Sequence, residues 1–541
     1  MEIVVDEKRS KIMQRVQIVG AGLAGITAAI VLAKNGIKSN LISNQPSERA
    51  QSVLAEGGIN AALNTMGEDD NWEYHYADTI KAGCHIADEE AVKLMTKNAP
   101  EVIQFLDDVG VPFNKTNNII KLRNFGGQKK KRTAYVKSST GKSVMTALIN
   151  EARKYEKSGV INRYSNHEFI ELIPHKQDST LQGIKVMDIY THSVMDLFGP
   201  VILAFGGMSG LFPNMTTGTS INNSNALAKL FSQGMKLSNL EMIQYHPTTI
   251  KISGKRCLVS EAARGEGGRL FVYKDSKPYF FMEEKYPELG NLMPRDIVSR
   301  EMFFIIKDKK YDSQVYLDLT NISQKVLKTK LPDLCEEIKY YLGINPKKKP
   351  IPVEPGIHYF MGGIWVDYAH RTNVEGVYAA GECCSQYHGA NRLGGNSLLG
   401  AIYGGMTSAI QICESRNMLQ DYKYSTYDSI ANTKNIMQEV RPKIVLAIGK
   451  ILNEALGIVR NDKVLLNGII QIQELRQENS LSSSEYDRTI LAEAIIRSAI
   501  FRKESRGAHY RDDYPNTDIN LCKPILVSFK EGIKLEYMEK K

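Results

Sequence analysis

The sequence predicts an α/β protein built on a doubly wound, Rossmann-like sheet, with an inserted α+β capping domain and a C-terminal helical domain. Two observations predict this architecture. Near the N-terminus a short apolar strand runs into a glycine-rich turn and then a helix, which is the order that a dinucleotide-binding unit requires. The 541 residues also exceed the size at which one hydrophobic core stops growing, so we expect several domains.

The first unit begins with an apolar run over residues 16–20, typical of a buried strand. The turn that follows has the spacing G-x-G-x-x-G, with its glycines at Gly20, Gly22 and Gly25. A helix is expected as far as Lys34, followed by a second strand over 38–43. That strand ends in Ser43, where an Asp or Glu commonly holds the ribose hydroxyl; the serine hydroxyl or the backbone can take this role.

Later segments divide the remaining chain. Residues 200–205 and 376–380 read as further sheet strands, because each is apolar and ends in a glycine turn. The lysine-, aspartate- and tyrosine-rich loops after residue 250 indicate an inserted domain, and helical apolar spacing indicates a later helical one. The predicted segments are the first part of the dinucleotide domain (1–249), the cap (250–353), the second part of the dinucleotide domain (354–420), the helical domain (421–510) and a tail (511–541).

Composition excludes several functional classes. With 43% hydrophobic and 24% charged residues the chain is typical of soluble globular proteins. Its net charge is +9, but the sequence contains no motif of a nucleic-acid-binding module. The seven cysteines show neither C-x-x-C nor metal-ligand spacing, which indicates reduced thiols, a cytoplasmic location and no metal. Residues 1–15 lack the apolar core of a signal peptide. Residues 16–33 approach membrane-span length, but glycines interrupt them, so no span is expected.

A second glycine-rich segment lies at residues 388–400, His-Gly-Ala-Asn-Arg-Leu-Gly-Gly-Asn-Ser-Leu-Leu-Gly. Its single cation is Arg392, and Asn396 or Ser397 can cap a helix that begins there. A guanidinium beside a helix N-terminus indicates a site for negative charge. Taken alone, the segment fits equally well a surface turn with a solvated arginine.

Other charged residues stand beside glycine or proline, in positions where a purely structural role is less expected. They are His246, Glu261, Arg264, Arg295 and His358. Each one alone is more often structural, and Arg295 beside Asp296 resembles an ordinary ion pair. Together, in a chain with a dinucleotide motif, they indicate a chemical site.

These segments resemble, in the same order and over nearly the whole chain, the flavoprotein subunit of succinate dehydrogenase and fumarate reductase. That family also holds L-aspartate oxidase. The matching segments are 20–25, 55–62, 71–75, 246–248, 264–268, 294–300, 358–363, 388–399 and 504–509. One departure is Asn-Asn-Ser-Asn at 222–225, where many relatives have Thr-Gly-Asp-Gly; it affects local loop contacts rather than the fold.

The resemblance implies FAD as cofactor. The dinucleotide would lie along Gly20, Gly22 and Gly25, and the other implied contacts are Ser43 at the ribose, Gly57 and Gly58 at the flavin, Glu382 on the adenosine side, and Ser397 and Leu398 at the flavin N1/O2 edge. The last assignment is physically reasonable, because reduction places negative charge at that edge and a helix N-terminus stabilises it.

The resemblance also implies interconversion of fumarate and succinate by hydride transfer at flavin N5. His246, Ser260, His358 and Arg392 would hold the C4 dicarboxylate. Arg295 would handle the proton on the neighbouring carbon, and Glu261 and Arg264 would resupply it. Since the pKa of a guanidinium in water is above ~12, this role requires a desolvated pocket and a hydrogen-bonded relay.

Two positions distinguish members of the family. L-Aspartate oxidase carries a glutamate where this chain has Phe125, and a phenyl ring cannot pair with a substrate ammonium. Most succinate dehydrogenase and fumarate reductase flavoproteins carry, at the position of Gln51, a histidine bonded covalently to the flavin. Glutamine has no ring nitrogen to form that bond, so we expect noncovalent FAD, a lower flavin potential and a preference for fumarate reduction.

No cysteine motif for an iron–sulfur cluster is present, so electrons must come from outside the chain. The resemblance suggests an iron–sulfur subunit with a membrane anchor, as in electron transport and the tricarboxylic acid cycle; a soluble donor is the other option. The chain would then be cytoplasmic, alone or peripheral on the membrane through its partners. Two rival functions remain at this point: an L-aspartate oxidase that makes iminoaspartate for NAD biosynthesis, and a flavin-binding protein without catalysis.

Overall fold

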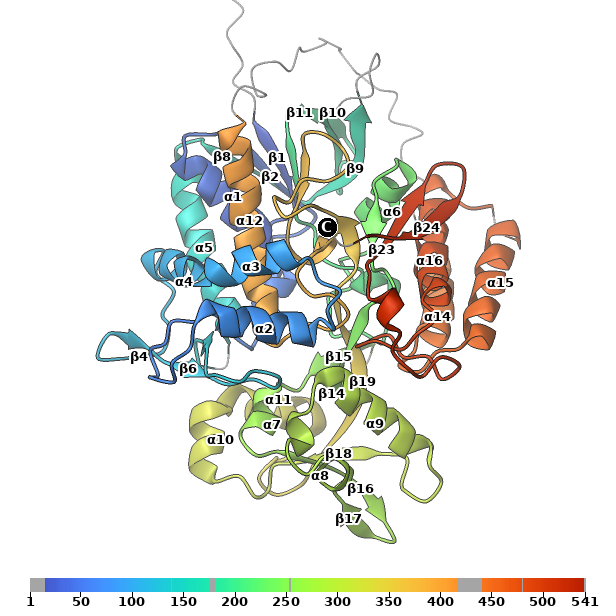
Figure 1. Ribbon diagram of the computed structural model, residues 1–541. Helices are drawn as coiled ribbons and strands as arrows, with labels where there is room; N and C mark the ends of the chain where they lie inside the picture. The colour runs from blue at the N-terminus through green and yellow to red at the C-terminus, as the bar shows by residue number, and fades with distance from the viewer. Residues whose placement is uncertain are drawn as a thin grey trace, which may run out of the picture.

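The computed structural model describes residues 15–137, 139–174, 181–252, 254–415, 440–478 and 480–539. The predicted start of the helical domain at residue 421 lies outside these residues. Three groups of elements are distinct in Figure 1: a body around the N-terminal sheet, a lobe below it, and a set of long helices beside it. The lobe has its own cluster of buried side chains, and so do the helices around the N-terminal sheet. A third cluster joins the long C-terminal helices to the body.

The body is built on a five-stranded sheet in which all neighbouring strands are parallel. In spatial order the strands are β21 (Val377–Ala379), β12 (Val201–Leu203), β1 (Val16–Val19), β2 (Ser39–Ser43) and β8 (Ile161–Ser165). The chain winds outward from β1 in both directions, which confirms the doubly wound α/β fold. Ligands of such sheets bind at the carboxyl ends of the strands beside this reversal.

Helices cover this sheet, and their apolar side chains form one continuous core with it. The helix α1 packs against both α5 and α12, and these three lie side by side in Figure 1. The body helices are α1 (Leu23–Lys34), α2 (Trp72–Ala82), α3 (Glu89–Lys97), α4 (Ala99–Asp108), α5 (Thr140–Lys157) and α12 (Asn396–Glu414). A three-stranded antiparallel sheet of β9 (His167–Pro174), β10 (Leu181–Asp188) and β11 (Val194–Phe198) adjoins the body.

The start of α12 corrects one expectation. Neither Asn396 nor Ser397 caps this helix: Gly395 is the N-cap residue, with φ +85, and no side chain bonds the first turn. A Cβ at Gly395 would lie 2.1 Å from Asn60 Oδ1, so glycine is required there. The Asn396 side chain serves tertiary packing instead, because it accepts from Asn60 Nδ2 at 2.7 Å and donates to Thr79 at 2.9 Å.

The lower lobe, which we call the cap, shares a six-stranded antiparallel sheet with the body. Two long strands, β14 (Ile243–Ile252) and β19 (Ile351–Phe360), run from the body into the cap and pair with each other. The remaining cap strands are β15 (Lys255–Leu258), β16 (Arg269–Lys274), β17 (Lys277–Tyr279) and β18 (Val315–Asp318). Its helices are α7 (Ala262–Gly265), α8 (Phe281–Lys285), α9 (Arg295–Lys307), α10 (Gln324–Lys330) and α11 (Pro332–Leu342).

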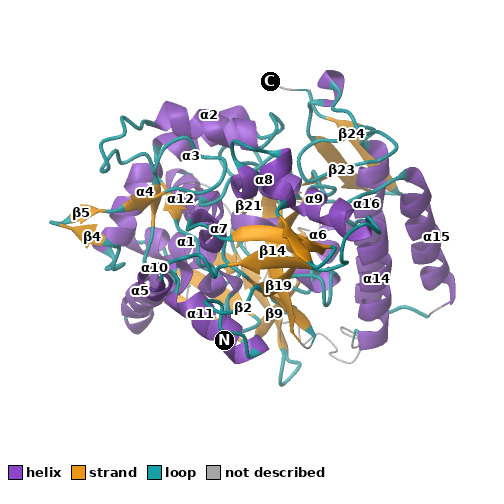
Figure 2. Ribbon diagram, turned by 90° about the horizontal axis from the view of Figure 1, so that it is seen from below, coloured by secondary structure: helices purple, strands orange, loops and turns teal. Residues whose placement is uncertain are grey.

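Three helices form the C-terminal group at the right of Figure 1: α14 (Pro442–Ala455), α15 (Asp462–Glu478) and α16 (Ser483–Phe501). The last of them packs against α6 (Asn225–Ser232) of the body. The predicted tail strand is present as β23 (Ile525–Phe529), which pairs with β13 (Leu237–Ser238) and β24 (Ile533–Tyr537). Figure 2 shows β23 and β24 side by side. No helix within the described residues has the length and hydropathy needed to cross a membrane.

Candidate active site

A cavity of about 1040 Å³ opens where the carboxyl ends of the central strands face the cap. Val19, Ala204 and Ala380, each at or just after a strand end, line its floor. Of the residues predicted to bind the cofactor, the lining includes Gly20, Gly22, Ser43, Gly57, Gly58, Glu382, Ser397 and Leu398. Gly25 is the one that lies outside the lining.

The N-terminal glycine turn is so closely packed that only glycine fits at two of its positions. Gly20 adopts φ +114, and a Cβ there would lie 2.1 Å from the carbonyl oxygen of Ala204. A Cβ at Gly25 would lie 1.8 Å from the Gly20 carbonyl, so Gly25 serves the packing of α1 onto the turn rather than ligand contact. The N–H of Leu23 donates to the Ser52 hydroxyl at 3.3 Å, and the rest of the first turn of α1 opens onto the cavity, where its N–H groups can meet an anion.

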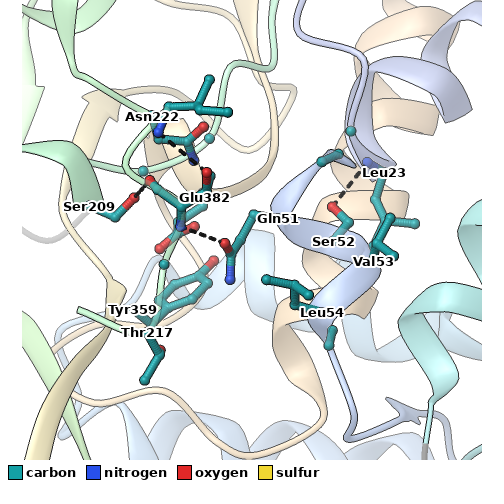
Figure 3. A pocket seen from close by; sticks show the side chains of 18 of the residues that line it. Leu23, Gln51, Ser52, Val53, Leu54, Ser209, Thr217, Asn222, Tyr359 and Glu382 are labelled. Carbon is teal, nitrogen blue, oxygen red and sulfur yellow. Dashed lines mark hydrogen bonds between the residues drawn. The ribbon is translucent and has the colours of Figure 1, made fainter. Parts of the chain in front are cut away.

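Figure 3 shows the cavity from close by, with Gln51 and Tyr359 both pointing into it. The side-chain carbonyl of Gln51 accepts from the backbone N–H of Thr219 at 2.7 Å. Glu382 accepts from the backbone N–H of Phe360 at 3.1 Å, and burial raises its pKa to about 7. A Cβ at Gly207 would lie 2.7 Å from Glu382, which explains the glycine after β12.

At the cap side of the cavity, a buried ion pair joins the loop before α7 to the first residue of α9. Arg295 donates to Glu261 Oε2 through Nε at 2.8 Å and through Nη2 at 2.6 Å. Burial would raise the pKa of Glu261, but Arg295 and Arg264 outweigh it and lower the pKa to about 2. The glutamate is therefore ionised at neutral pH, in spite of being buried.

Arg264 lies behind this pair and does not line the cavity. Its Nη2 is 3.9 Å from Glu261 Oε1, and its Nη1 donates to the carbonyl of Asn291 at 2.6 Å. Glu261 thus bridges two guanidinium groups, one in the cavity and one buried beneath it. Only the link between Arg295 and Glu261 is hydrogen-bonded, since the Nη2 atom of Arg264 has no hydrogen-bond partner within the described residues.

Two histidines on neighbouring strands face each other across the cavity wall. His246 on β14 and His358 on β19 have ring centroids 5.2 Å apart. Burial and the charge of Arg295 lower the pKa of both rings well below 6.5, so both are neutral at pH 7. The Nε2 atom of His246 is buried and has no hydrogen-bond partner among the described residues, which indicates a place for a ligand atom.

Arg392, from the glycine-rich segment, completes the polar wall. It is buried, and its guanidinium lies 4.4 Å from the centroid of the Tyr359 ring. Burial and the nearby Arg295 lower its pKa to about 9, which leaves it charged at neutral pH. The solvated surface arginine that the segment also allowed is therefore wrong.

Ser260 and Phe125 also lie in the lining. The Phe125 ring is 3.6 Å from where a Gly57 Cβ would stand, and the guanidinium of Arg123 lies 5.1 Å from the ring centroid.

Sequence reasoning missed several residues of this site. Gln244 accepts from Arg295 Nη1 at 3.3 Å and donates to the carbonyl of Arg392 at 3.0 Å, so it connects the two arginines. Thr217 bonds His358 Nδ1 at 2.9 Å. Neither residue stands out in the sequence by its type or its neighbours. The one available signal is that Gln244 and His246 are two residues apart, which in a strand predicts that they lie on the same face.

Comparisons with known proteins agree with this geometry. The FAD binding domain family matches residues 15–398, and the family described as fumarate reductase flavoprotein C-term matches residues 446–541. The chain is 37% identical to the succinate dehydrogenase flavoprotein subunit of Bacillus subtilis, with 92% of this chain and 91% of that protein covered. It is 31% identical to the fumarate reductase flavoprotein subunit of Haemophilus influenzae, with 96% and 92% covered.

The chain belongs to the succinate dehydrogenase/fumarate reductase flavoprotein family. A solved structure agrees: a variant of FrdA from E. coli quinol fumarate reductase superposes with a TM-score of 0.87 at 29% identity, covering 97% of this chain and 96% of that one. As a member of this family the protein is an oxidoreductase of the FAD-binding type.

The loop that departs from the family pattern also fits the cavity. Ser224 adopts φ +63, a conformation that glycine takes more easily. The Asn222 amide lies beside Gly206, since a Cβ at Gly206 would be 2.5 Å from Asn222 Nδ2. The departure thus changes contacts within the lining and leaves the fold of the family intact.

Proposed function

We propose that this flavoprotein interconverts fumarate and succinate, with noncovalent FAD, and that it works mainly as a fumarate reductase. One observation carries the proposal: a single cavity holds a glycine turn suited to a dinucleotide at one side and, at the other, two arginines with two neutral histidines. FAD, when bound, supplies the hydride for reduction or accepts it in the reverse direction.

The polar wall suits a dicarboxylate. Arg392 and Arg295 offer two positive charges, only one of which is balanced by Glu261, so the wall attracts anions. His246, His358 and Ser260 add polar groups that can bond carboxylate oxygens without adding net charge. Because the pocket is desolvated, each of these hydrogen bonds discriminates strongly against a ligand that lacks its partner oxygen.

Arg295 is the group we assign to proton transfer at the carbon next to the one that exchanges hydride. Fumarate plus a hydride and this proton gives succinate, so charge and atoms balance. Glu261 is ionised and bonded to the guanidinium at 2.6 Å, so after the transfer it can take up a proton and pass it to Arg295. Arg264 lies 3.9 Å from the other Glu261 oxygen and makes no hydrogen bond to it among the described residues, so a relay through Arg264 requires this gap to close.

Phe125 favours a dicarboxylate over an amino acid. Its ring contacts the region of Gly57 and Gly394 and carries no acceptor for an ammonium group. The nearby Arg123 guanidinium would repel such a group. These contacts argue against the L-aspartate oxidase function.

Gln51 supports noncovalent FAD. Its amide bonds the backbone of Thr219 and offers no nucleophilic nitrogen to a flavin. Loss of a covalent bond is expected to lower the flavin potential, which favours fumarate reduction. For electron supply we propose an iron–sulfur partner subunit, on or near a membrane anchor, in line with the subunit names of the relatives.

Steady-state kinetics with the purified flavoprotein test the proposal. With a reduced viologen dye as donor, we expect fumarate reduction faster than succinate oxidation measured with an oxidising dye. Conversion of L-aspartate to iminoaspartate without fumarate reduction would overturn it. The proteins that copurify with the chain from its native cell test the partner: recovery without any iron–sulfur subunit would count against that assignment.

A further inference from the structure

An acidic group lies at the seam between the cap and the body. Glu56, in the loop before Gly57, faces Asp333 and Glu337 of α11 across a second cavity of about 40 Å³. All three carboxyl groups also line the large cavity. The seam therefore adjoins the proposed substrate wall.

Glu56 is connected to that wall through a single hydroxyl. Its carboxyl group is hydrogen-bonded to Ser260, which lies beside Glu261 in the loop before α7. No salt bridge to Glu56 occurs within the described ranges, although Arg123 is adjacent. Arg123 donates to the backbone carbonyls of Glu56 and Gly57, and its guanidinium stacks over the Phe125 and Tyr135 rings.

The other charges around Glu56 do not neutralise the group. Ser139 of the body donates to Asp333 at 2.9 Å, and Lys330 of α10, which lines the small cavity, pairs with Glu266 at 2.7 Å. Besides Glu56, the charged residues that line the small cavity are Arg123, Lys330, Asp333 and Glu337, and Lys255 and the thiol of Cys257 lie close enough to interact electrostatically with this group. Burial, together with Glu337, raises the pKa of Glu56 to about 8, and burial raises the pKa of Glu337 as well.

We propose that Glu56 is a positioning residue that must carry a proton when a dicarboxylate binds, so that binding is coupled to proton uptake. The inference rests on the proposed function. A protonated Glu56 donates to Ser260 Oγ and leaves the serine O–H free to bond a substrate carboxylate. An ionised Glu56 accepts the serine O–H instead and adds a negative charge close to the dianion.

The direct test is the Kd of fumarate for the oxidised holoenzyme, which cannot turn over without an electron donor. We compare the wild type with Glu56→Gln, whose amide can donate to Ser260 at any pH, and with Glu101→Gln on the exposed side of α4 as control. Measurements at pH 6.5 and 8.5 remain below the pKa of Arg392, which is lowered to about 9.

With a Glu56 pKa of about 8, the wild-type Kd should rise about fourfold between these pH values, and Glu101→Gln should rise equally. Glu56→Gln should stay within about 1.5-fold, by the same relation. An equal rise in Glu56→Gln, or no rise in the wild type, would overturn the inference. Failure of the wild type to bind fumarate at any pH would instead overturn the proposed function.

A second variant covers the case in which Glu56→Gln loses its flavin or does not fold. Glu337→Gln removes the charge that helps to hold the Glu56 proton, so the rise in Kd should begin at lower pH than in the wild type. A profile identical to that of the wild type would contradict the coupling of these two carboxyl groups and, with it, the inference.

Discussion

Replacing Arg295 with glutamine tests the assigned proton donor. Arg295 makes two hydrogen bonds to Glu261, at 2.8 and 2.6 Å, and one to Gln244 at 3.3 Å. The glutamine side chain fills part of the same space but cannot donate a proton to carbon. A positioned general acid contributes about 10²–10⁴-fold to rate, or about 3–5 kcal/mol in the barrier, so kcat for fumarate reduction should fall by this factor.

The same substitution leaves Glu261 buried without a hydrogen-bonded guanidinium, with Arg264 at 3.9 Å and a weaker attraction from Arg392. Because Arg295 contributes most among the three arginines that lower the pKa of Glu261 to about 2, that pKa should rise in Arg295→Gln. Breaking a buried ion pair costs about 3–5 kcal/mol when the remaining charge stays ionised, and protonation of Glu261 lessens this cost. The variant Glu261→Gln/Arg295→Gln should therefore unfold at a higher urea concentration than Arg295→Gln alone, although both are equally inactive.

The assay is fumarate reduction with a reduced viologen dye, after flavin content has been matched by absorbance. Arg300→Gln is the control, since Arg300 lies on the same helix with its guanidinium 4.8 Å from the Tyr510 ring centroid, and its kcat should stay within about twofold. If Arg295→Gln keeps its flavin and its kcat falls less than tenfold, the proton-transfer role of Arg295 is refuted.

Three further predictions concern the cofactor and stability. Acid precipitation of the wild type should leave the yellow flavin in the supernatant, because Gln51 cannot bond it; colour in the pellet would contradict this. Gly20→Ala should abolish flavin binding, because the new Cβ would lie 2.1 Å from the carbonyl oxygen of Ala204. The control Gly265→Ala, whose Cβ would have no atom within 4 Å, should bind flavin normally. Equal flavin content in the two variants would refute the role of the glycine turn in flavin binding. The free energy of unfolding should fall as the pH drops from 7.5 to 5.5. The buried histidines with lowered pKa stay neutral in the folded protein but bind protons below about pH 6.5 in the unfolded chain. Each of them then contributes about 1.4 kcal/mol per pH unit. These histidines are His75, His246, His358, His370, His388 and His509. A urea midpoint that does not change between these pH values would contradict the last prediction.

The fold could be predicted where a local pattern determines local structure. The apolar strand at β1, its glycine turn and α1 follow from spacing alone, and they appear within a residue of the expected bounds. The cap of α12 could not be predicted, because it depends on Asn60, which lies far away in the sequence and packs against Gly395. Local propensity favours Asn396 or Ser397 there, but tertiary contacts override it.

The residues of the site divide in the same way, into those that a local pattern predicts and those that only the fold brings together. Residues flanked by glycine or proline, such as Arg295 and His358, stand out in the sequence and meet in one cavity. Gln244 and Glu56 do not stand out, because their importance comes from the residues that the fold brings next to them. From the sequence alone, a glutamate in a polar loop is expected to be solvated. In the structure, the cap places two further carboxyl groups next to this one.

A single-turnover experiment tests the central claim most directly. The flavoprotein is reduced photochemically without oxygen, mixed with fumarate, and followed by flavin absorbance while the product is analysed. We expect reoxidation of the flavin with one succinate formed per flavin. A flavin that stays reduced in the presence of fumarate, while L-aspartate reduces the oxidised form, would contradict it.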